Sequence, residues 1–118
     1  MFTLEVHSES DHLLLRIGGE LDLHSRTAFV EGLTELQRQT PHLIVLDLSD
    51  LKFVDSSGLG ALLAILRVPE ESRPRLVLTR CDGPVRRVLR TTRLDLLLGV
   101  HSSVEAALAQ PASVGSAA

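Results

Sequence analysis

The chain has 118 residues and a mass of 12.8 kDa, which is the size of one ordinary globular domain. Hydrophobic residues make up 44% and charged residues 23% of it, which excludes wholesale disorder and fibrous repeats. A formal net charge of -3 gives no general attraction to nucleic acid. The single cysteine, Cys81, excludes an internal disulfide, and the scattered histidines do not predict a metal site.

Nothing in the sequence predicts secretion or a membrane span. The first residues carry no basic region ahead of an apolar core. The most apolar stretch, 58–66, is far shorter than the ~20 residues that a membrane span needs. We therefore expect a cytoplasmic protein.

The N-terminal residues predict an antiparallel β-hairpin. Apolar residues recur at every second position in two runs, first at 2, 4 and 6 and then at 13, 15 and 17, and the polar residues 8–11 separate the two runs. Alternation with a period of two, interrupted by turn residues, is typical of two half-buried strands. Gly18 and Gly19 are expected to end the second strand.

A helix and a buried strand are expected after the hairpin. Ser25 is the expected N-cap of this helix, whose apolar face has three residues at helical spacing, Phe29, Leu33 and Leu36. Residues 42–48 are almost continuously apolar, which is typical of a strand that is covered on both faces.

The second half of the chain alternates between predicted helices and strands. We first expect a helix from Asp55 with an apolar stripe that includes Leu66, and then a charged loop between Pro69 and Pro74. A strand over 75–80 and a helix that begins at 82–84 should follow. The last predicted elements are a short strand over 96–100 and a helix capped by Ser102 or Ser103.

These patterns together predict an α/β domain. Its mixed sheet should have about four to five strands and about four helices, with the hairpin antiparallel and the later strands parallel. We expect residues 1–109 to form this domain. Residues 110–118, which are rich in small side chains, should form a flexible C-terminal tail.

The turn before the second helix is the candidate functional segment. Asp55, Ser56, Ser57 and Gly58 follow the buried strand, at the edge of an open α/β sheet where ligands and partners bind. The simplest interpretation is that these residues only cap the helix. One cap is enough, however, and we expect Asp55 to provide it. Two hydroxyls then remain at a helix N-terminus, which tolerates the charge of a phosphorylated serine.

The sequence around this turn resembles a known family. Residues 43–60, with Asp-Ser-Ser-Gly at 55–58, and residues 19–23, Gly-Glu-Leu-Asp-Leu, are similar to two blocks of the STAS domain of bacterial anti-sigma factor antagonists. The order of the predicted elements also matches that domain over residues 2–109. The resemblance implies a single STAS-type α/β domain.

The resemblance also implies a protein-binding switch that is not an enzyme. Members of the family bind an anti-sigma factor that is itself a serine kinase of the GHKL ATPase type, and so release the sigma factor. Phosphorylation breaks that complex, and a serine phosphatase restores it. Because the kinase brings ATP and magnesium, we expect no cofactor in this chain.

The resemblance assigns roles to particular residues. It places the phosphate on Ser57, with Ser56 as the fallback acceptor. It also places Asp22 near the turn, where this residue helps to meet the kinase. The further residues that we expect at the partner contact are Asp55, Ser56, Gly58 and two apolar residues of the second helix, Leu59 and Leu62.

The residues give less support to other functions. A serine nucleophile lacks the Gly-x-Ser-x-Gly pattern and a clustered base. A two-component receiver would use an acid such as Asp47, but it also needs an acid pair after the first strand and a late lysine, and Lys52 is the only lysine. Four arginines in the third helix region favour a solvated helix face over a nucleic-acid or lipid site: Arg86, Arg87, Arg90 and Arg93.

Alternatives within the family stay open. STAS domains also serve as scaffolds or stressosome components and as soluble subunits of lipid transport systems. The intact Asp-Ser-Ser-Gly turn favours the sigma-regulatory role. The protein should be a monomer or a weak dimer, because an edge strand of the hairpin can pair between copies.

Overall fold

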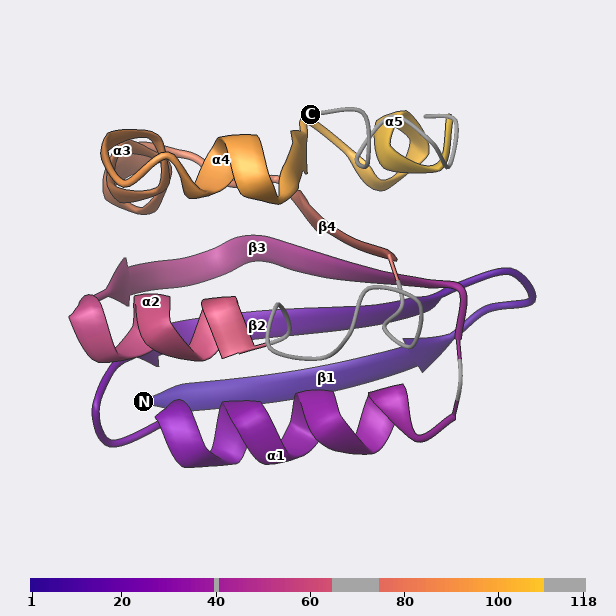
Figure 1. The fold of residues 1–118 in the computed structure, drawn as a ribbon, viewed down its shortest axis with the longest axis horizontal. Helices are drawn as coiled ribbons and strands as arrows, with labels where there is room; N and C mark the ends of the chain where they lie inside the picture. Colours follow the sequence, from indigo (N-terminus) through magenta and orange to yellow (C-terminus); the bar gives the residue numbers. More distant parts are fainter. Residues whose placement is uncertain (40, 65–74, 110–118) are drawn as a thin grey trace.

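The computed structural model describes residues 1–39, 41–64 and 75–109. Within these ranges the chain forms five strands and five helices (Figure 1). The strands are β1 (Phe2–Ser8), β2 (Leu13–Leu21), β3 (Leu43–Val54), β4 (Arg75–Thr79) and β5 (Gly99–His101). The helices are α1 (Arg26–Gln37), α2 (Ser56–Leu63), α3 (Gly83–Thr91), α4 (Leu94–Leu97) and α5 (Val104–Leu108).

The strands form one mixed sheet in the order β1-β2-β3-β4-β5. β1 pairs antiparallel with β2, whereas β3 pairs parallel with β2 and β4, and β5 pairs parallel with β4. This confirms the predicted hairpin followed by parallel strands. The carboxyl ends of the four parallel strands therefore meet at one edge of the sheet, where the turn into α2 lies (Figure 1).

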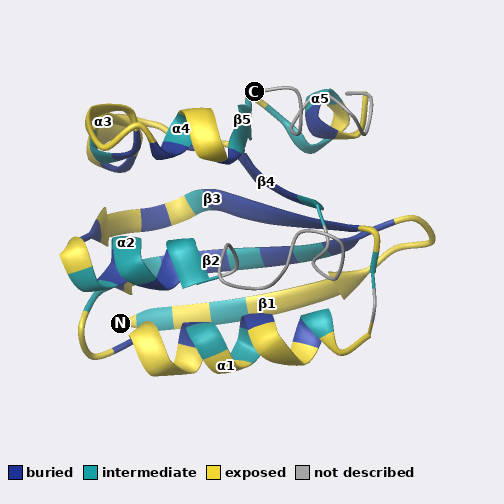
Figure 2. Cartoon of the chain, in the orientation of Figure 1, coloured by how far each residue is buried: buried dark blue, intermediate teal, exposed yellow. Residues whose placement is uncertain are grey.

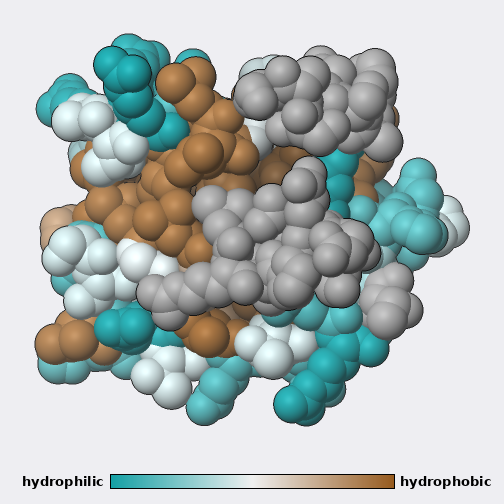
Figure 3. All heavy atoms as spheres, in the orientation of Figure 1, coloured by the Kyte–Doolittle hydropathy of each residue, from teal (hydrophilic) through white to brown (hydrophobic). Residues whose placement is uncertain are grey.

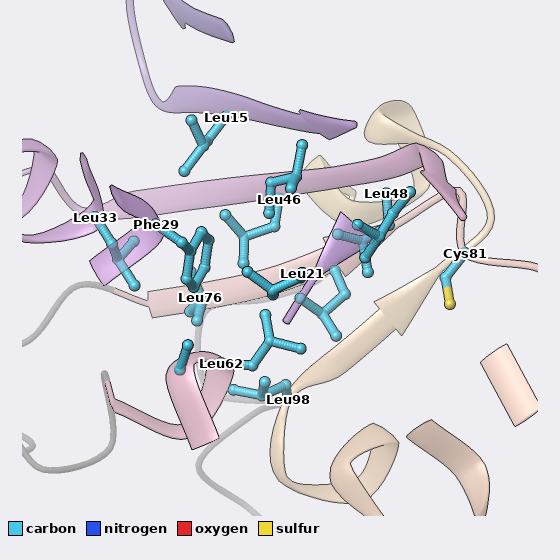
Figure 4. Close-up of a cluster of buried hydrophobic side chains, with 14 of the residues drawn as sticks. Leu15, Leu21, Phe29, Leu33, Leu46, Leu48, Leu62, Leu76, Cys81 and Leu98 are labelled. Atoms are coloured by element: carbon cyan, nitrogen blue, oxygen red, sulfur yellow. The ribbon is translucent and has the colours of Figure 1, made fainter. Parts of the chain in front are cut away.

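The two faces of the sheet are covered by different helices. Successive residues of a strand point to opposite faces, so Leu46 faces one way and Val45 the other. The first face holds the main core, in which Phe29 of α1 and Leu62 of α2 gather with Leu46 (Figure 4). Part of the opposite face is covered by α5, where Val45 packs in a smaller cluster with Ala107.

Two strands run further than the sequence patterns predict. β2 continues through Gly18 and Gly19 to Leu21, and β3 continues well beyond its predicted end to Val54. The pairing register between the two strands shifts twice within Arg16–Glu20, and such irregularities let a strand accommodate glycines without ending. The predicted ends of both strands are therefore wrong. As a result, Leu21 pairs with Val54 directly before the candidate turn.

The C-terminal third contains a one-turn helix that the patterns do not predict. The expected strand over 96–100 is replaced by α4 and then β5, which begins at Gly99. Arg93 adopts a left-handed conformation, with φ of 63°, and redirects the chain between α3 and α4. A short run of leucines fits a helix as well as a strand, so periodicity alone could not decide between them. The expected cap of the last helix is confirmed, because Ser103 Oγ accepts a hydrogen bond from Ala106 N.

Three expectations lie outside the described residues: the charged loop between Pro69 and Pro74, the part of the apolar stripe at Leu66, and the tail over 110–118. Among the helices of the described ranges, none has the length and apolar character needed to cross a membrane.

Candidate functional site

The turn between β3 and α2 is organised by the side chain of Asp55. Asp55 has an extended backbone, and its Oδ1 accepts a hydrogen bond from the Gly58 N–H at 2.9 Å. Its carbonyl oxygen accepts the Leu59 N–H at 2.9 Å, which starts the helical ladder. The prediction that Asp55 caps the helix is confirmed. Neither serine hydroxyl is needed for that purpose.

The two serines are the first residues of α2 and differ in exposure. Ser56 is exposed, and Ser57 is partly buried but still reaches the surface. Across the described ranges, neither hydroxyl makes a hydrogen bond to another residue. Both hydroxyls therefore remain available to a molecule that docks over the start of the helix.

Gly58 brings the start of α2 against the end of β2. A methyl group at this position would overlap the carbonyl oxygen of Leu21 and would lie 2.7 Å from Cγ2 of Val54. The Asp55 N–H also donates a hydrogen bond to the Leu21 carbonyl oxygen at 3.3 Å. Because only a residue without Cβ permits this approach, Gly58 has a packing role in addition to any role at the surface.

Asp22 directly follows Leu21, so the two sequence blocks meet at this point. Its Oδ1 accepts hydrogen bonds from the backbone N–H of His24 at 2.9 Å and of Ser25 at 3.2 Å. Desolvation works to raise the pKa of Asp22, but the hydrogen bonds from Ser25 and His24 outweigh it, so the pKa lies below its usual value. Asp22 is therefore ionised at neutral pH beside the turn.

Ser25 stands at the predicted N-cap position of α1 but acts differently. Its hydroxyl makes no capping hydrogen bond to α1. Instead it donates to the Glu20 carbonyl oxygen at 2.7 Å and accepts from the Asp22 N–H at 2.9 Å. The hydroxyl is thus used to hold the connection from β2 to α1, because the buried backbone groups of this turn require partners.

Apolar side chains around the turn fall into two groups. Leu62 is fully buried in the core, so the expectation that it is exposed for a partner is wrong. It lies on the inner side of α2, one helical turn beyond Gly58, whereas Leu59 is only partly buried. Leu23, next to Asp22, and Phe53, two residues before Asp55, are exposed by 62% and 48%. Neither residue is among the contact residues predicted from the sequence, although an apolar residue next to a polar turn was the available signal.

Asp47, the acid that a receiver domain would use, has a structural role. It is completely buried in β3, where its carboxylate accepts hydrogen bonds from Arg16 Nε at 3.2 Å and from the Ser49 N–H at 2.9 Å. Arg80 approaches the same carboxylate at 3.5 Å. A carboxylate held between two guanidinium groups inside a strand is not placed to receive a phosphoryl group.

The arrangement offers no metal chemistry of its own in the ranges described. No group of three or more His, Cys, Asp or Glu side chains there could hold a metal ion. Cys81 is buried, and burial raises the pKa of its thiol to about 11, so it is a poor nucleophile at neutral pH. The site presents a hydroxyl beside carboxylates at a helix N-terminus.

Sequence comparison assigns almost the whole chain to one type of domain. A family model described as the STAS domain matches residues 3–107. An anti-sigma F factor antagonist of Paenibacillus polymyxa is 29% identical over 108 residues, which cover 91% of this chain and 92% of that protein. The matched region includes both sequence blocks and all the described elements that form the site.

Solved structures share the fold. An anti-sigma factor antagonist from Mycobacterium paratuberculosis superimposes with a TM-score of 0.81 at 24% identity, over 92% of each chain. The Bacillus cell fate determinant SpoIIAA in its phosphorylated form has a TM-score of 0.65 at 26% identity, over 92% of this chain and 96% of the other. The likeness therefore extends over the sheet and the turn at its carboxyl edge.

Proposed function

The chain belongs to the STAS domain family, and from this premise we propose that it is a cytoplasmic anti-sigma factor antagonist that is switched by phosphorylation of Ser57. In its unphosphorylated form it binds an anti-sigma factor kinase of the GHKL ATPase type and so releases the sigma factor. The kinase transfers a phosphoryl group to Ser57, and a serine phosphatase removes it. The chain itself supplies no catalytic group.

One observation carries this proposal: the Ser57 hydroxyl reaches the surface at the start of α2 while Asp55 fills the capping role. A hydroxyl that the fold does not use can be modified without loss of a structural hydrogen bond. The names of similar proteins support the same role, because a relative over most of the chain is an anti-sigma F factor antagonist. SpoIIAA, with 26% identity, has been solved in a phosphorylated form.

The effect of the phosphate follows from its charge. A phosphoserine carries about -1.5 to -2 charges at neutral pH and would stand beside Asp22 and Asp55. The N-terminus of α2 partly compensates this charge, so the domain should stay folded. A partner that docks over the turn must instead remove water from a dianion, which costs several kcal/mol by analogy with buried unpaired ions.

The partner contact should extend from the serines over the neighbouring exposed side chains. Asp22 and Ser56 provide polar contacts on both sides of Ser57. Leu23 and Phe53 provide exposed apolar area beside them, and Leu59 adds a partly buried side chain on the first turn of α2. Gly58 keeps these groups together through its contact with Leu21.

The acceptor assignment is tested with a matched pair of variants, Ser57→Ala and Ser56→Ala. Each purified protein is incubated with magnesium-ATP and, one at a time, with the anti-sigma factor kinases of the same genome. Intact-mass spectrometry and peptide mapping then locate the phosphate. We expect Ser57→Ala to abolish phosphate uptake and Ser56→Ala to retain it, and the opposite pattern would move the acceptor to Ser56.

The charge mechanism needs a second measurement, namely the affinity of Ser57→Asp for the kinase that modifies the wild type. A single carboxylate carries less charge than a phosphate, so the complex should weaken by at least about tenfold, which corresponds to about 1.4 kcal/mol. Ser57→Ala should bind as the wild type does. If Ser57→Asp bound equally well, repulsion of a charge at this turn would not be the mechanism.

A further inference from the structure

The outer face of α3 carries a row of arginines. Val85 and Leu89 are buried on the inner side of the helix. Arg86, Arg87 and Arg90 are all exposed, and at 100° per residue they fall within an arc of about 100° opposite the buried side. Figure 2 shows exposed residues over most of the visible surface of α3.

These arginines are not neutralised by the protein. In the described ranges none of the three forms an ion pair, and neither does Arg93, which is exposed beyond the end of α3. Arg80 is excluded from this count because it pairs with Asp47. Residues 82–98 still contain four arginines and two aspartates, a net charge of +2, although the whole chain carries -3. One surface of an acidic protein is therefore strongly cationic.

Two exposed leucines adjoin the cationic row. α4 packs against α3, and its residues Leu96 and Leu97 are exposed by 66% and 62%. Figure 3 shows hydrophobic side chains over the position of α4 directly beside hydrophilic side chains over α3. Adjacent leucines this exposed have no role in the core, and clusters of this kind mark interaction sites.

We propose that the α3–α4 surface is a docking site for an anionic lipid bilayer. Arg86, Arg87, Arg90 and Arg93 would lie among the lipid headgroups, while Leu96 and Leu97 insert into the apolar boundary below them. Juxtaposed cations and exposed apolar side chains are the combination by which peripheral proteins bind anionic interfaces. The sequence alone favoured a solvated face, because it could not show that the arginines are unpaired or that leucines lie beside them.

The charge distribution fits a bilayer. The molecule measures 31 × 27 × 25 Å, so acidic groups on its far side lie beyond the Debye length of about 10 Å at 0.1 M salt. The membrane would then interact mainly with the net positive charge of the α3–α4 region, in which four arginines outnumber Asp82 and Asp95. Nucleic acid is a poorer fit, because the chain contains no Trp or Tyr and only three Phe for base stacking.

Binding to lipid vesicles tests the proposal. The intact protein is sedimented with vesicles of equal parts phosphatidylglycerol and phosphatidylcholine, and separately with pure phosphatidylcholine vesicles. Each arginine at an anionic surface should contribute about fivefold to partitioning, so Arg86→Gln/Arg87→Gln/Arg90→Gln should bind about 100-fold more weakly than wild type. Leu96→Gln/Leu97→Gln should lower binding by about tenfold or more. Circular dichroism confirms that each variant is folded.

A charge-matched control separates this surface from net charge. Arg26→Gln/Arg38→Gln/Lys52→Gln removes the same number of positive charges from exposed positions outside α3 and α4. If only the α3–α4 surface contacts the membrane, this variant should bind anionic vesicles within about twofold of wild type. The proposal is overturned if wild type ignores anionic vesicles or if both triple variants lose binding equally. It is likewise overturned if soluble polyglutamate binds this surface while vesicles do not, because the occupant is then an acidic protein segment.

Discussion

Substitution of Gly58 by alanine should destabilise the protein, although alanine is the better helix former. Inside a helix this exchange normally stabilises by about 0.5–1 kcal/mol. Here the new methyl group would overlap the carbonyl oxygen of Leu21, lie 2.9 Å from the Leu21 carbonyl carbon and lie 2.7 Å from Val54 Cγ2. Two of these three atoms belong to the backbone, so a change of side-chain rotamer cannot relieve the overlap.

The expected magnitude follows from what must move. Forcing a methyl group into a packed site costs about 1–3 kcal/mol. Displacing α2 would also break the Asp55–Leu21 hydrogen bond, which contributes about 1 kcal/mol. After the gain in helix propensity is subtracted, we expect a net loss of about 1–3 kcal/mol in the free energy of unfolding. For a chain of this size that corresponds to a decrease in Tm of about 10 °C.

Gly60 provides the matched control in the same helix. A methyl group at Gly60 would have no other atom within 4 Å, so Gly60→Ala should stabilise by about 0.5–1 kcal/mol. Urea unfolding should be followed by circular dichroism, since the chain has no Trp or Tyr to report by fluorescence. The midpoint should shift in opposite directions for the two variants, with m unchanged. If Gly58→Ala were as stable as Gly60→Ala, the close approach to Leu21 would not exist.

Three further changes test the core, the cap and the buried acid. Leu62→Ala should cost about 2–5 kcal/mol of unfolding free energy because the side chain is fully buried, and calorimetry should show a clearly smaller loss for Leu59→Ala. Asp55→Ala should cost about 1 kcal/mol in urea unfolding because it removes the cap of α2; no loss would mean that the cap is not stabilising. Desolvation works to raise the pKa of Asp47, but hydrogen bonds from Ser49 and Arg16 and the charge of Arg80 outweigh it, so the pKa in the folded state lies below its ordinary value. A depressed pKa stabilises the fold above the unfolded pKa of about 4 and loses that contribution as the pH falls through the folded value. The free energy of unfolding should therefore decline as the pH falls below about 4, and it should decline less in Asp47→Asn than in wild type. An identical decline in the two proteins would exclude Asp47 as its source.

Local patterns in the sequence determined much of the architecture. The alternation over 2–6 and 13–17 predicted the hairpin, and the apolar run over 42–48 predicted a central strand. Both predictions were possible because the order of apolar residues along a strand shows whether one or both of its faces are buried. The capping role of Asp55 was also accessible, since a cap involves only the next three residues. For the same reason Ser57 could be placed at a helix N-terminus before its surroundings were known.

The tertiary structure alone decided which side chains reach the surface at the site. Leu59 and Leu62 look equivalent as leucines of one helix, but the sheet below α2 buries Leu62 completely and leaves Leu59 partly open. The end of β2 likewise meets Gly58 only because register shifts carry that strand beyond its glycines. The contact between Leu21 and Gly58 joins residues more than thirty positions apart, and backbone preferences that act over a few residues contain no information about it.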